Sequence, residues 1–214
     1  MNREAAISSL QQKLREFGIR DERVLRAFRE VPRDAFCHAE DRTYAFEDRV
    51  LPLREGATLS QPSVIAAMLQ ALELGPGDRV LEIGSGSGYS TALLCELAGS
   101  VRGLEVDPEL VYSAQQTLSE LGYANATLIA GDGRQGDYDH APYDAIILHC
   151  AVPYVSPALL DQLAVGARLV APVGGASAQE LLVFRADRDA ARQEGALFPV
   201  RFVPAHPPKA DFLR

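Results

Sequence analysis

Strand-like and helical hydrophobic patterns alternate along the chain after residue 78. Strand-like runs recur at 79–83, 101–106, 126–130, 144–149, 167–173 and 180–185. Stretches with helical spacing separate the first five runs, at 88–98, 108–121 and 157–163. Strands that alternate with helices in this way form a mostly parallel sheet with helices on both faces. The pattern therefore predicts an α/β, doubly wound, Rossmann-like fold, to which the extended run 198–203 adds a late antiparallel strand.

Residues 1–76 form a different region, helical and irregular, in front of the sheet. Apolar side chains in residues 3–30 recur at spacings of three and four, which favours an N-terminal helical extension. Residues 40–59 lack a regular pattern, apart from a short extended stretch. We expect this region to pack with residues 77–214 as one compact unit, and the tail 206–214 to be irregular.

A glycine-rich loop follows the first predicted strand of the sheet. Gly84, Gly86 and Gly88 stand at alternate positions in the run Val80-Leu-Glu-Ile-Gly-Ser-Gly-Ser-Gly-Tyr89, just before a predicted helix. Glycine tolerates positive φ, and the N-terminus of the helix offers unpaired N–H groups to a ligand. A dinucleotide fingerprint needs a further glycine where this chain has Tyr89. The spacing therefore favours S-adenosylmethionine, which has no pyrophosphate, and the competing interpretation is a plain turn.

Acidic side chains stand where three of the predicted strands end. Glu82 can reach an amino group of a ligand, because a buried carboxylate is costly unless it finds a partner. Glu105 lies about twenty residues beyond the glycines, where an acid accepts from ribose hydroxyls. Asp132 can accept from an adenine amino group. The alternatives are that Glu105 or Asp107 caps a helix opened by Pro108, and that Asp132 belongs to a turn.

Composition narrows the choice of partners. The formal net charge of −8 argues against nucleic acid, because neutralising phosphates needs a basic face. Three separated cysteines, Cys37, Cys95 and Cys150, are typical of a reducing compartment, and no apolar run is long enough for a membrane span. We expect a cytoplasmic protein that binds neither a membrane nor a metal ion. A monomer is expected.

Ser60 has two interpretations. Ser60 and Gln61 precede Pro62, where a helix reaching to about residue 74 begins. A serine just before a proline at a helix start is a good N-cap. The competing interpretation places the hydroxyl in a substrate site.

Several motifs, in one order along the chain, resemble those of the protein-L-isoaspartate (D-aspartate) O-methyltransferase family. The matching stretches are Val31–Phe36, Gly56–Pro62, Val80–Tyr89, Leu159–Leu163, Pro172–Gly174, Gln179–Leu182 and Phe198–Pro204. They extend over residues 20–204, so the resemblance is far more specific than the glycine loop alone.

The resemblance implies a class I, S-adenosylmethionine-dependent methyltransferase. Such enzymes methylate the free carboxylate of L-isoaspartyl or D-aspartyl residues in damaged proteins and peptides, and the ester then closes to a succinimide. The implied catalytic residue is Ser60, and the implied substrate-binding residues are Thr58, Leu59, Gln61, His149 and Val203. The implied cofactor-binding residues are Glu82, Gly84, Ser85, Gly86, Ser87, Gly88, Glu105, Val106, Asp132 and Gly133. Because a carboxylate is ionised at neutral pH, this chemistry needs no general base.

Three positions depart from the family pattern. Position 57 is alanine, His149-Cys150 stand where threonine or glycine and then alanines are usual, and Ala205-His206 replace a common Leu-Thr. We expect these changes near the acceptor pocket, with His149 either buried and hydrogen-bonded or part of the acceptor site. The alternatives are a methyltransferase for another carboxylate, such as a modified peptide or small acid, an RNA methyltransferase, which the charge disfavours, or a non-catalytic module that recognises damaged peptides.

Overall fold

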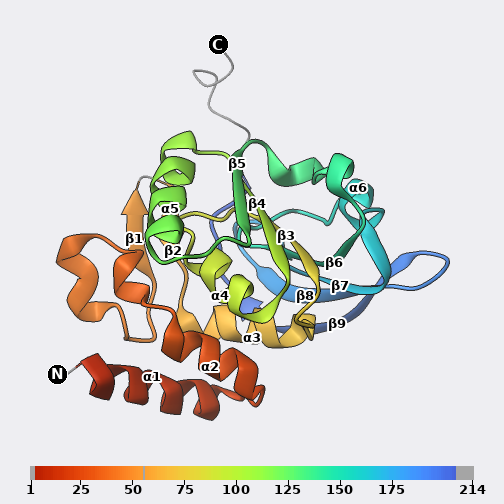
Figure 1. Cartoon of the computed structure of the whole chain (residues 1–214). Coiled ribbons are helices and arrows are strands. Elements are labelled where there is room, and N and C mark those ends of the chain that lie inside the picture. The colour runs from red at the N-terminus through yellow and green to blue at the C-terminus, as the bar shows by residue number, and fades with distance from the viewer. Residues whose placement is uncertain (1–2, 55, 206–214) are drawn as a thin grey trace.

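The computed structural model describes residues 3–54 and 56–205 (Figure 1). The irregular tail predicted at 206–214 lies outside these residues, and so does the departure at His206. Within the described residues, no helix is both long enough and apolar enough to cross a bilayer.

Two helices confirm the helical pattern of the N-terminal residues. Helix α1 spans Arg3–Phe17 and helix α2 spans Glu22–Glu30. The Asp21 side chain accepts from two backbone N–H groups in the first turn of α2, and so caps this helix. Both helices bury an apolar face in a hydrophobic cluster that also contains side chains of the sheet. The two predicted segments of the chain therefore share one core.

The region expected to be irregular contains short regular elements. Two 3₁₀-helices, η1 (Arg33–Ala35) and η2 (Ala39–Tyr44), precede two antiparallel strands, β1 (Leu51–Arg54) and β2 (Ala57–Leu59). Strand β1 buries Leu51 and Leu53 and exposes Pro52. This period of two extends over so few residues that the hydrophobic pattern alone identifies only an extended stretch.

In the described part of the chain, seven strands form one sheet in the order β5-β4-β3-β6-β7-β8-β9. Their bounds are β3 Arg79–Ile83, β4 Ser100–Glu105, β5 Ala126–Ala130, β6 Tyr143–Leu148, β7 Leu163–Gly174, β8 Gln179–Ala186 and β9 Ala191–Val200. Neighbours from β5 to β7 are parallel, and β8 is antiparallel to both β7 and β9. The mostly parallel, doubly wound fold is confirmed. Because the strand order switches between β3 and β6, a ligand crevice is expected at their carboxyl ends.

The two faces of the sheet are covered differently (Figure 1). Helices α3 (Pro62–Leu72), α4 (Tyr89–Leu97) and α5 (Pro108–Glu120) pack on one face, in the same cluster as α1 and α2. The short helix α6 (Pro157–Leu160) packs on the other face. The connection between β5 and β6, which contains the 3₁₀-helices η3 (Gly133–Gln135) and η4 (Tyr138–His140), also lies on this side. Successive side chains of β3 alternate between these faces, with Val80 in the first cluster and Leu81 in the second.

The C-terminal elements differ most from the predicted boundaries. Strand β9 ends at Val200, although the run at 198–203 was expected to form the last strand. Most β9 side chains are exposed on this sheet edge, so the hydrophobic pattern that identifies strands is missing from the first part of β9. Helix α6 ends at Leu160 and not at residue 163, because Leu163 already pairs with Tyr143 in the sheet.

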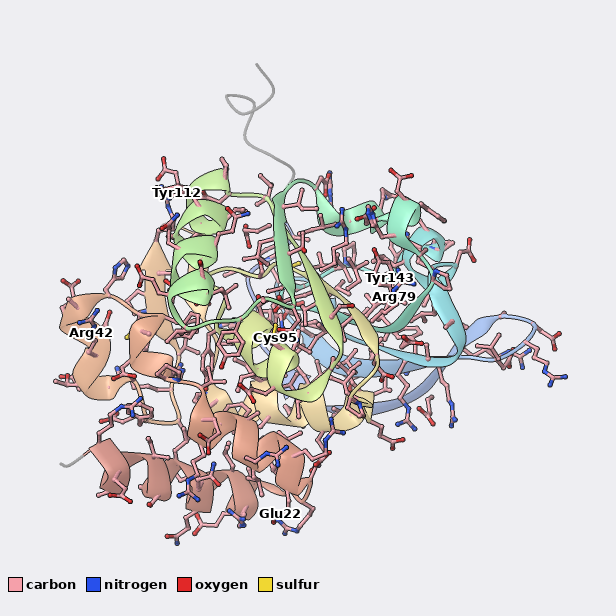
Figure 2. All side chains as sticks on the ribbon, viewed as in Figure 1. Glu22, Arg42, Arg79, Cys95, Tyr112 and Tyr143 are labelled. Carbon is pink, nitrogen blue, oxygen red and sulfur yellow. The ribbon has the colours of Figure 1, made fainter. Side chains whose placement is uncertain are left out.

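The amino edge of the sheet holds β3 and β6 together far from the crevice. The guanidinium carbon of Arg79, at the start of β3, lies 6.0 Å from the ring centroid of Tyr143, at the start of β6 (Figure 2). The backbone N–H of Arg79 donates to the Asp144 carboxylate over 2.9 Å. These contacts keep the two strands that flank the switch point in register.

Candidate functional site

Loops from four parallel strands meet at the carboxyl edge of the sheet and form a narrow cleft. Gly84 follows β3, Glu105 ends β4, Asp132 follows β5 and His149 follows β6. All four residues line the cleft, which apolar side chains of Ile83 and neighbouring positions complete. The sequence-predicted cofactor residues on its wall are Gly84, Gly86, Glu105, Val106, Asp132 and Gly133. The topology thus brings together residues that lie up to 65 positions apart (84 to 149).

The glycine loop has the backbone that the motif predicts. The φ angles of Gly84, Gly86 and Gly88 are +82°, +54° and +85°, all in the left-handed region that favours glycine. At Gly88 a Cβ would also lie 3.1 Å from the Cβ of Ala114, so close packing against α5 disfavours a side chain there. Three predicted cofactor residues of this loop do not line the cleft: Ser85, Ser87 and Gly88.

Glu82 lies beneath the loop, with no exposed surface. Its carboxylate accepts from the Ser90 hydroxyl and, over 2.5 Å, from the Thr91 hydroxyl, both in the first turn of α4. Its Oε1 also lies 3.3 Å from Nε2 of His149. Sequence reasoning placed Glu82 against an amino group of the ligand, whereas the structure places this carboxylate behind the cleft wall, where it positions the start of α4.

Glu105 and Asp107 divide the two roles that the sequence left open. Glu105 lines the cleft, and its carboxylate accepts from the backbone N–H groups of Gly86, over 2.9 Å, and Asp107, over 3.0 Å. Asp107 caps α5 by accepting from two N–H groups of its first turn. Burial raises the pKa of Glu105, and the two accepted hydrogen bonds oppose that rise. Glu105 therefore links the glycine loop to the adjacent strand end inside the cleft.

Asp132 combines a turn with a place on the cleft wall. Its side chain accepts from the backbone N–H of Arg134 and so caps η3. The Arg134 guanidinium also lies 2.6 Å from the Asp132 carboxylate, and this hydrogen bond lowers the pKa of Asp132. The carboxylate is thus held as an anion that can accept from a donor in the cleft.

The residues after β6 are buried side chains of the same cleft. The His149 side chain is 6% exposed, and its Nε2 faces Glu82 without a hydrogen bond of good geometry. Burial raises the pKa of Cys150 to about 12, so the thiol stays protonated at neutral pH and packs as an apolar group beside Gly84. The structure therefore supports the predicted burial of His149 but not the predicted hydrogen bond. His149 lies in this cleft, away from the larger cavity described next.

A second cavity, of about 870 Å³, adjoins the cleft. Thr58, Val203 and Pro204 line both spaces, whereas Ser60 and Gln61 line only the second. Predicted substrate residues from β2, the start of α3 and the segment after β9 therefore meet around one cavity. Leu59 does not line it, because alternation along β2 exposes residue 58 and buries residue 59 in the core.

The capping interpretation of Ser60 is wrong. The N-cap residue of α3 is Gln61, whose side chain makes no capping hydrogen bond. Asp48, thirteen positions earlier than Gln61, provides the cap instead, because its Oδ1 accepts from the N–H of Ser63 over 2.8 Å. Among the described residues nothing hydrogen-bonds to the Ser60 hydroxyl, which therefore remains available in the cavity.

A buried arginine positions the backbone of Ser60. Arg33 is 1% exposed, and its guanidinium donates to the carbonyls of Ala45 (2.6 Å), Arg49 (3.0 Å) and Ser60 (3.0 Å), with a longer bond to a fourth carbonyl. Its guanidinium carbon also lies 5.6 Å from the ring centroid of Tyr89, the first residue of α4. Burial lowers the pKa of Arg33. One side chain thus joins the segment before α3 to the helix that follows the glycine loop.

Sequence reasoning missed this role of Arg33 and also missed two residues of the second cavity, Gln179 and Arg201. A signal existed for all three. Each lies in a motif on which the family resemblance depends, and Arg201 is the only charged residue of the stretch Phe198–Pro204.

Comparison with known proteins identifies the family. The profile of the family "Protein-L-isoaspartate(D-aspartate) O-methyltransferase (PCMT)" matches residues 5–209. The chain belongs to this family. A protein-L-isoaspartate O-methyltransferase of Roseiflexus sp. (strain RS-1) is 47% identical over 202 residues, which cover 94% of this chain and 90% of the relative. A homologue from Synechococcus sp. (strain JA-2-3B'a(2-13)) is 48% identical over 91% of this chain and 82% of its own length.

Solved PCMT structures share the fold of this chain. One, named a protein-L-isoaspartate O-methyltransferase, has a TM-score of 0.85 and 29% identity over 94% of this chain and 66% of that chain. A Plasmodium falciparum protein named as a PCMT, solved in complex with S-adenosyl-L-homocysteine, has a TM-score of 0.80 and 25% identity over 92% of this chain and 97% of its own. The family resemblance inferred from the sequence is confirmed.

The departures from the PCMT pattern lie elsewhere than expected. Ala57, His149 and Ala205 all line the narrow cleft, and none of them lines the second cavity. The reason is the pairing of distant segments. Ala205 donates its N–H to the carbonyl of Ala151 over 2.8 Å, which holds the segment 203–205 beside the residues after β6. The departures thus alter the cleft that contains the glycine loop.

Proposed function

We propose that this PCMT-family chain transfers a methyl group from S-adenosylmethionine to the free carboxylate of L-isoaspartyl or D-aspartyl residues in damaged proteins and peptides. The supporting observation is that the narrow cleft and the second cavity meet at Thr58, Val203 and Pro204. A donor held in the cleft and a peptide held in the cavity would touch at this junction. Hereafter the two spaces are the donor cleft and the acceptor cavity.

The residues of the donor cleft fit S-adenosylmethionine. Two glycines with positive φ, Gly84 and Gly86, leave one wall without side chains. The carboxylates of Glu105 and Asp132 can accept from hydroxyl and amino groups. Val106, which directly follows Glu105, adds an apolar surface for a planar base. When bound, the cofactor supplies an electrophilic methyl group on a positively charged sulfur.

The acceptor cavity has what methylation of a carboxylate requires. An aspartyl-type carboxylate, with a reference pKa of about 4, is already a nucleophilic anion at neutral pH, so no residue has to remove a proton. What remains is to hold one oxygen toward the methyl group and to exclude water. Such positioning can lower the activation barrier by about 7 kcal/mol or more. The Ser60 hydroxyl can donate one hydrogen bond to this carboxylate and leave the second oxygen free.

The position of the departures favours this acceptor over another carboxylate. Ala57, His149 and Ala205 line the donor cleft, so the described wall of the acceptor cavity carries none of these three departures. The proposed methyl ester also explains how repair begins. The neighbouring backbone nitrogen can attack the ester carbonyl, and methoxide leaves as methanol with the proton that the nitrogen loses, which closes a succinimide without further catalysis. The ionised carboxylate is a poor electrophile and has no comparable leaving group.

Two peptides that differ only in the linkage of one aspartyl residue test the proposal. We expect base-labile transfer of labelled methyl from S-adenosylmethionine to the isoaspartyl peptide and none to the normal peptide. Glu105→Ala should weaken binding of S-adenosylhomocysteine in calorimetry and lower turnover. Glu109→Ala is the matched control, because Glu109 is an exposed acid that pairs with Arg54 outside the donor cleft. Equal labelling of both peptides, or no base-labile label, would overturn the proposal.

A further inference from the structure

Arg201 is the only charged side chain on the described wall of the acceptor cavity. The rest of the wall consists of apolar and uncharged polar side chains, including Val50, Val64, Gln179 and Ser60. Arg201 is exposed, and no carboxylate within the described residues pairs with it. The cavity therefore contains a positive charge with no counter-charge from this part of the protein.

The backbone on both sides of Arg201 is fixed. Residue 200 ends β9. The buried side chain of Gln179 then accepts from the N–H of Phe202 over 2.7 Å and donates to its carbonyl over 3.1 Å. One residue later, the N–H of Ala151 donates to the carbonyl of Val203 over 2.8 Å. Because the backbone is held in this way, binding to the guanidinium has to order only the side chain itself.

The chemistry of methyl transfer restricts what Arg201 can bind. A guanidinium binds a carboxylate through two parallel N–H···O bonds, which occupy both oxygens. The carboxylate that accepts the methyl group needs one oxygen free to attack, so a bidentate arginine would oppose the reaction. A single hydroxyl donor, Ser60, suits that carboxylate. Arg201 therefore suits a second carboxylate of the same substrate.

We propose that Arg201 forms a subsite for a second carboxylate of the peptide, supplied by an acidic side chain near the isoaspartyl residue or by the C-terminus of the peptide. This inference rests on the proposed function, because it takes the cavity to hold the peptide. The subsite offsets repulsion of an anionic substrate from a chain with a net charge of −8. It makes Arg201 a specificity-determining residue, separate from the reacting atoms.

Three isoaspartyl peptides test the subsite and separate the two sources of the carboxylate. The first is neutral apart from the isoaspartyl carboxylate and amidated, the second adds one glutamate next to the isoaspartyl residue, and the third has a free C-terminus in place of the amide. Arg201→Gln should raise KM for the second peptide, the third or both by about three- to tenfold. For all three peptides kcat should stay within about twofold of wild type, and so should KM for the neutral peptide. The affected peptide identifies the source.

Arg192→Gln is the matched control. Arg192 is an exposed arginine near the start of β9, the strand that ends just before Arg201. It pairs with Asp187 away from the cavity, and its loss changes the net charge equally. Equal effects of the two variants, or an Arg201→Gln effect shared by all three peptides, would overturn the inference. Calorimetric Kd values for the same peptides with protein saturated in S-adenosylhomocysteine give the comparison without turnover. If wild-type protein methylates none of the peptides, the proposed function fails, while a charge-dependent Kd that Arg201→Gln abolishes still supports the subsite.

Discussion

Replacing Arg33 tests whether this buried side chain positions the acceptor cavity as well as stabilising the fold. In Arg33→Met the carbonyls of Ala45, Arg49 and Ser60 lose their donor, and the cation–π contact with Tyr89 is lost. Methionine keeps most of the side-chain volume, so the change removes hydrogen bonds more than packing. The Ser60 backbone is then no longer tied to the start of α4.

The expected magnitudes follow from these contacts. Four accepted hydrogen bonds at about 0.5–1.5 kcal/mol each amount to about 2–6 kcal/mol. Removing a desolvated charge returns part of this, so we expect a loss of about 2–4 kcal/mol in the free energy of unfolding, or about 4–16 °C in Tm. A displacement of Ser60 by about 1 Å would lower kcat about a hundredfold. The expected fall in kcat is therefore between about ten- and a hundredfold.

Arg23→Met is the control, because Arg23 also joins separate segments through hydrogen bonds to backbone carbonyls. Arg23 donates to the carbonyls of Leu74 and Leu97 but touches neither cavity. We expect Arg23→Met to lower Tm in thermal unfolding while kcat, measured well below both transitions, stays within about twofold. Arg33→Lys should recover part of kcat. The reasoning is refuted if Arg33→Met lowers Tm but keeps wild-type kcat, or if both variants lose kcat in proportion to stability.

Four further predictions follow from the geometry of the site. Ser60→Ala should lower kcat and change Tm by less than about 2 °C, because the hydroxyl caps nothing; a large loss of Tm with normal turnover would contradict this. Because burial raises the pKa of Glu105, affinity for S-adenosylhomocysteine should fall with decreasing pH in a range above that of an ordinary glutamate, as protonation removes an acceptor; calorimetry with Glu105→Gln should show no such fall. His149→Ala should weaken S-adenosylhomocysteine binding more than it raises the acceptor KM, and the reverse split would place His149 with the acceptor. Since the pKa of Cys150 is about 12, iodoacetamide near pH 8 should label it far more slowly than a free cysteine, as mass spectrometry can check.

Much of the donor cleft could be predicted because its residues lie where strands end. Gly84, Glu105 and Asp132 each follow or finish a hydrophobic run, and parallel strands place such ends at one edge of a sheet. Once the α/β alternation was recognised, these residues had to be close together. The short strands in the region predicted to be irregular were missed, and so was the early start of β9. Short or exposed strands carry too few apolar side chains for a period of two to be visible.

Some members of the acceptor cavity, such as Thr58 and Ser60, could be predicted through the family motifs, but its full set of residues, its location and its contacts could not. Its walls join segments more than 140 positions apart, such as Thr58 and Val203. No hydrophobic period records this pairing, which depends on how the segment after β9 packs against the residues after β6. The expectation that His149 and Ala57 flank the acceptor failed for this reason.

Local order along the chain was therefore enough for the strand–glycine loop–helix unit, for the sheet built around it and for the acids at its carboxyl edge, because backbone geometry and hydrophobic period are properties of neighbouring residues. Folding decided which polar group meets which. Glu82 binds hydroxyls of α4, Asp48 caps α3 in place of Ser60, and Arg33 binds carbonyls from several turns. Each choice follows from the cost of leaving a buried donor or acceptor unpaired, and the available partners are known only once distant segments have packed together.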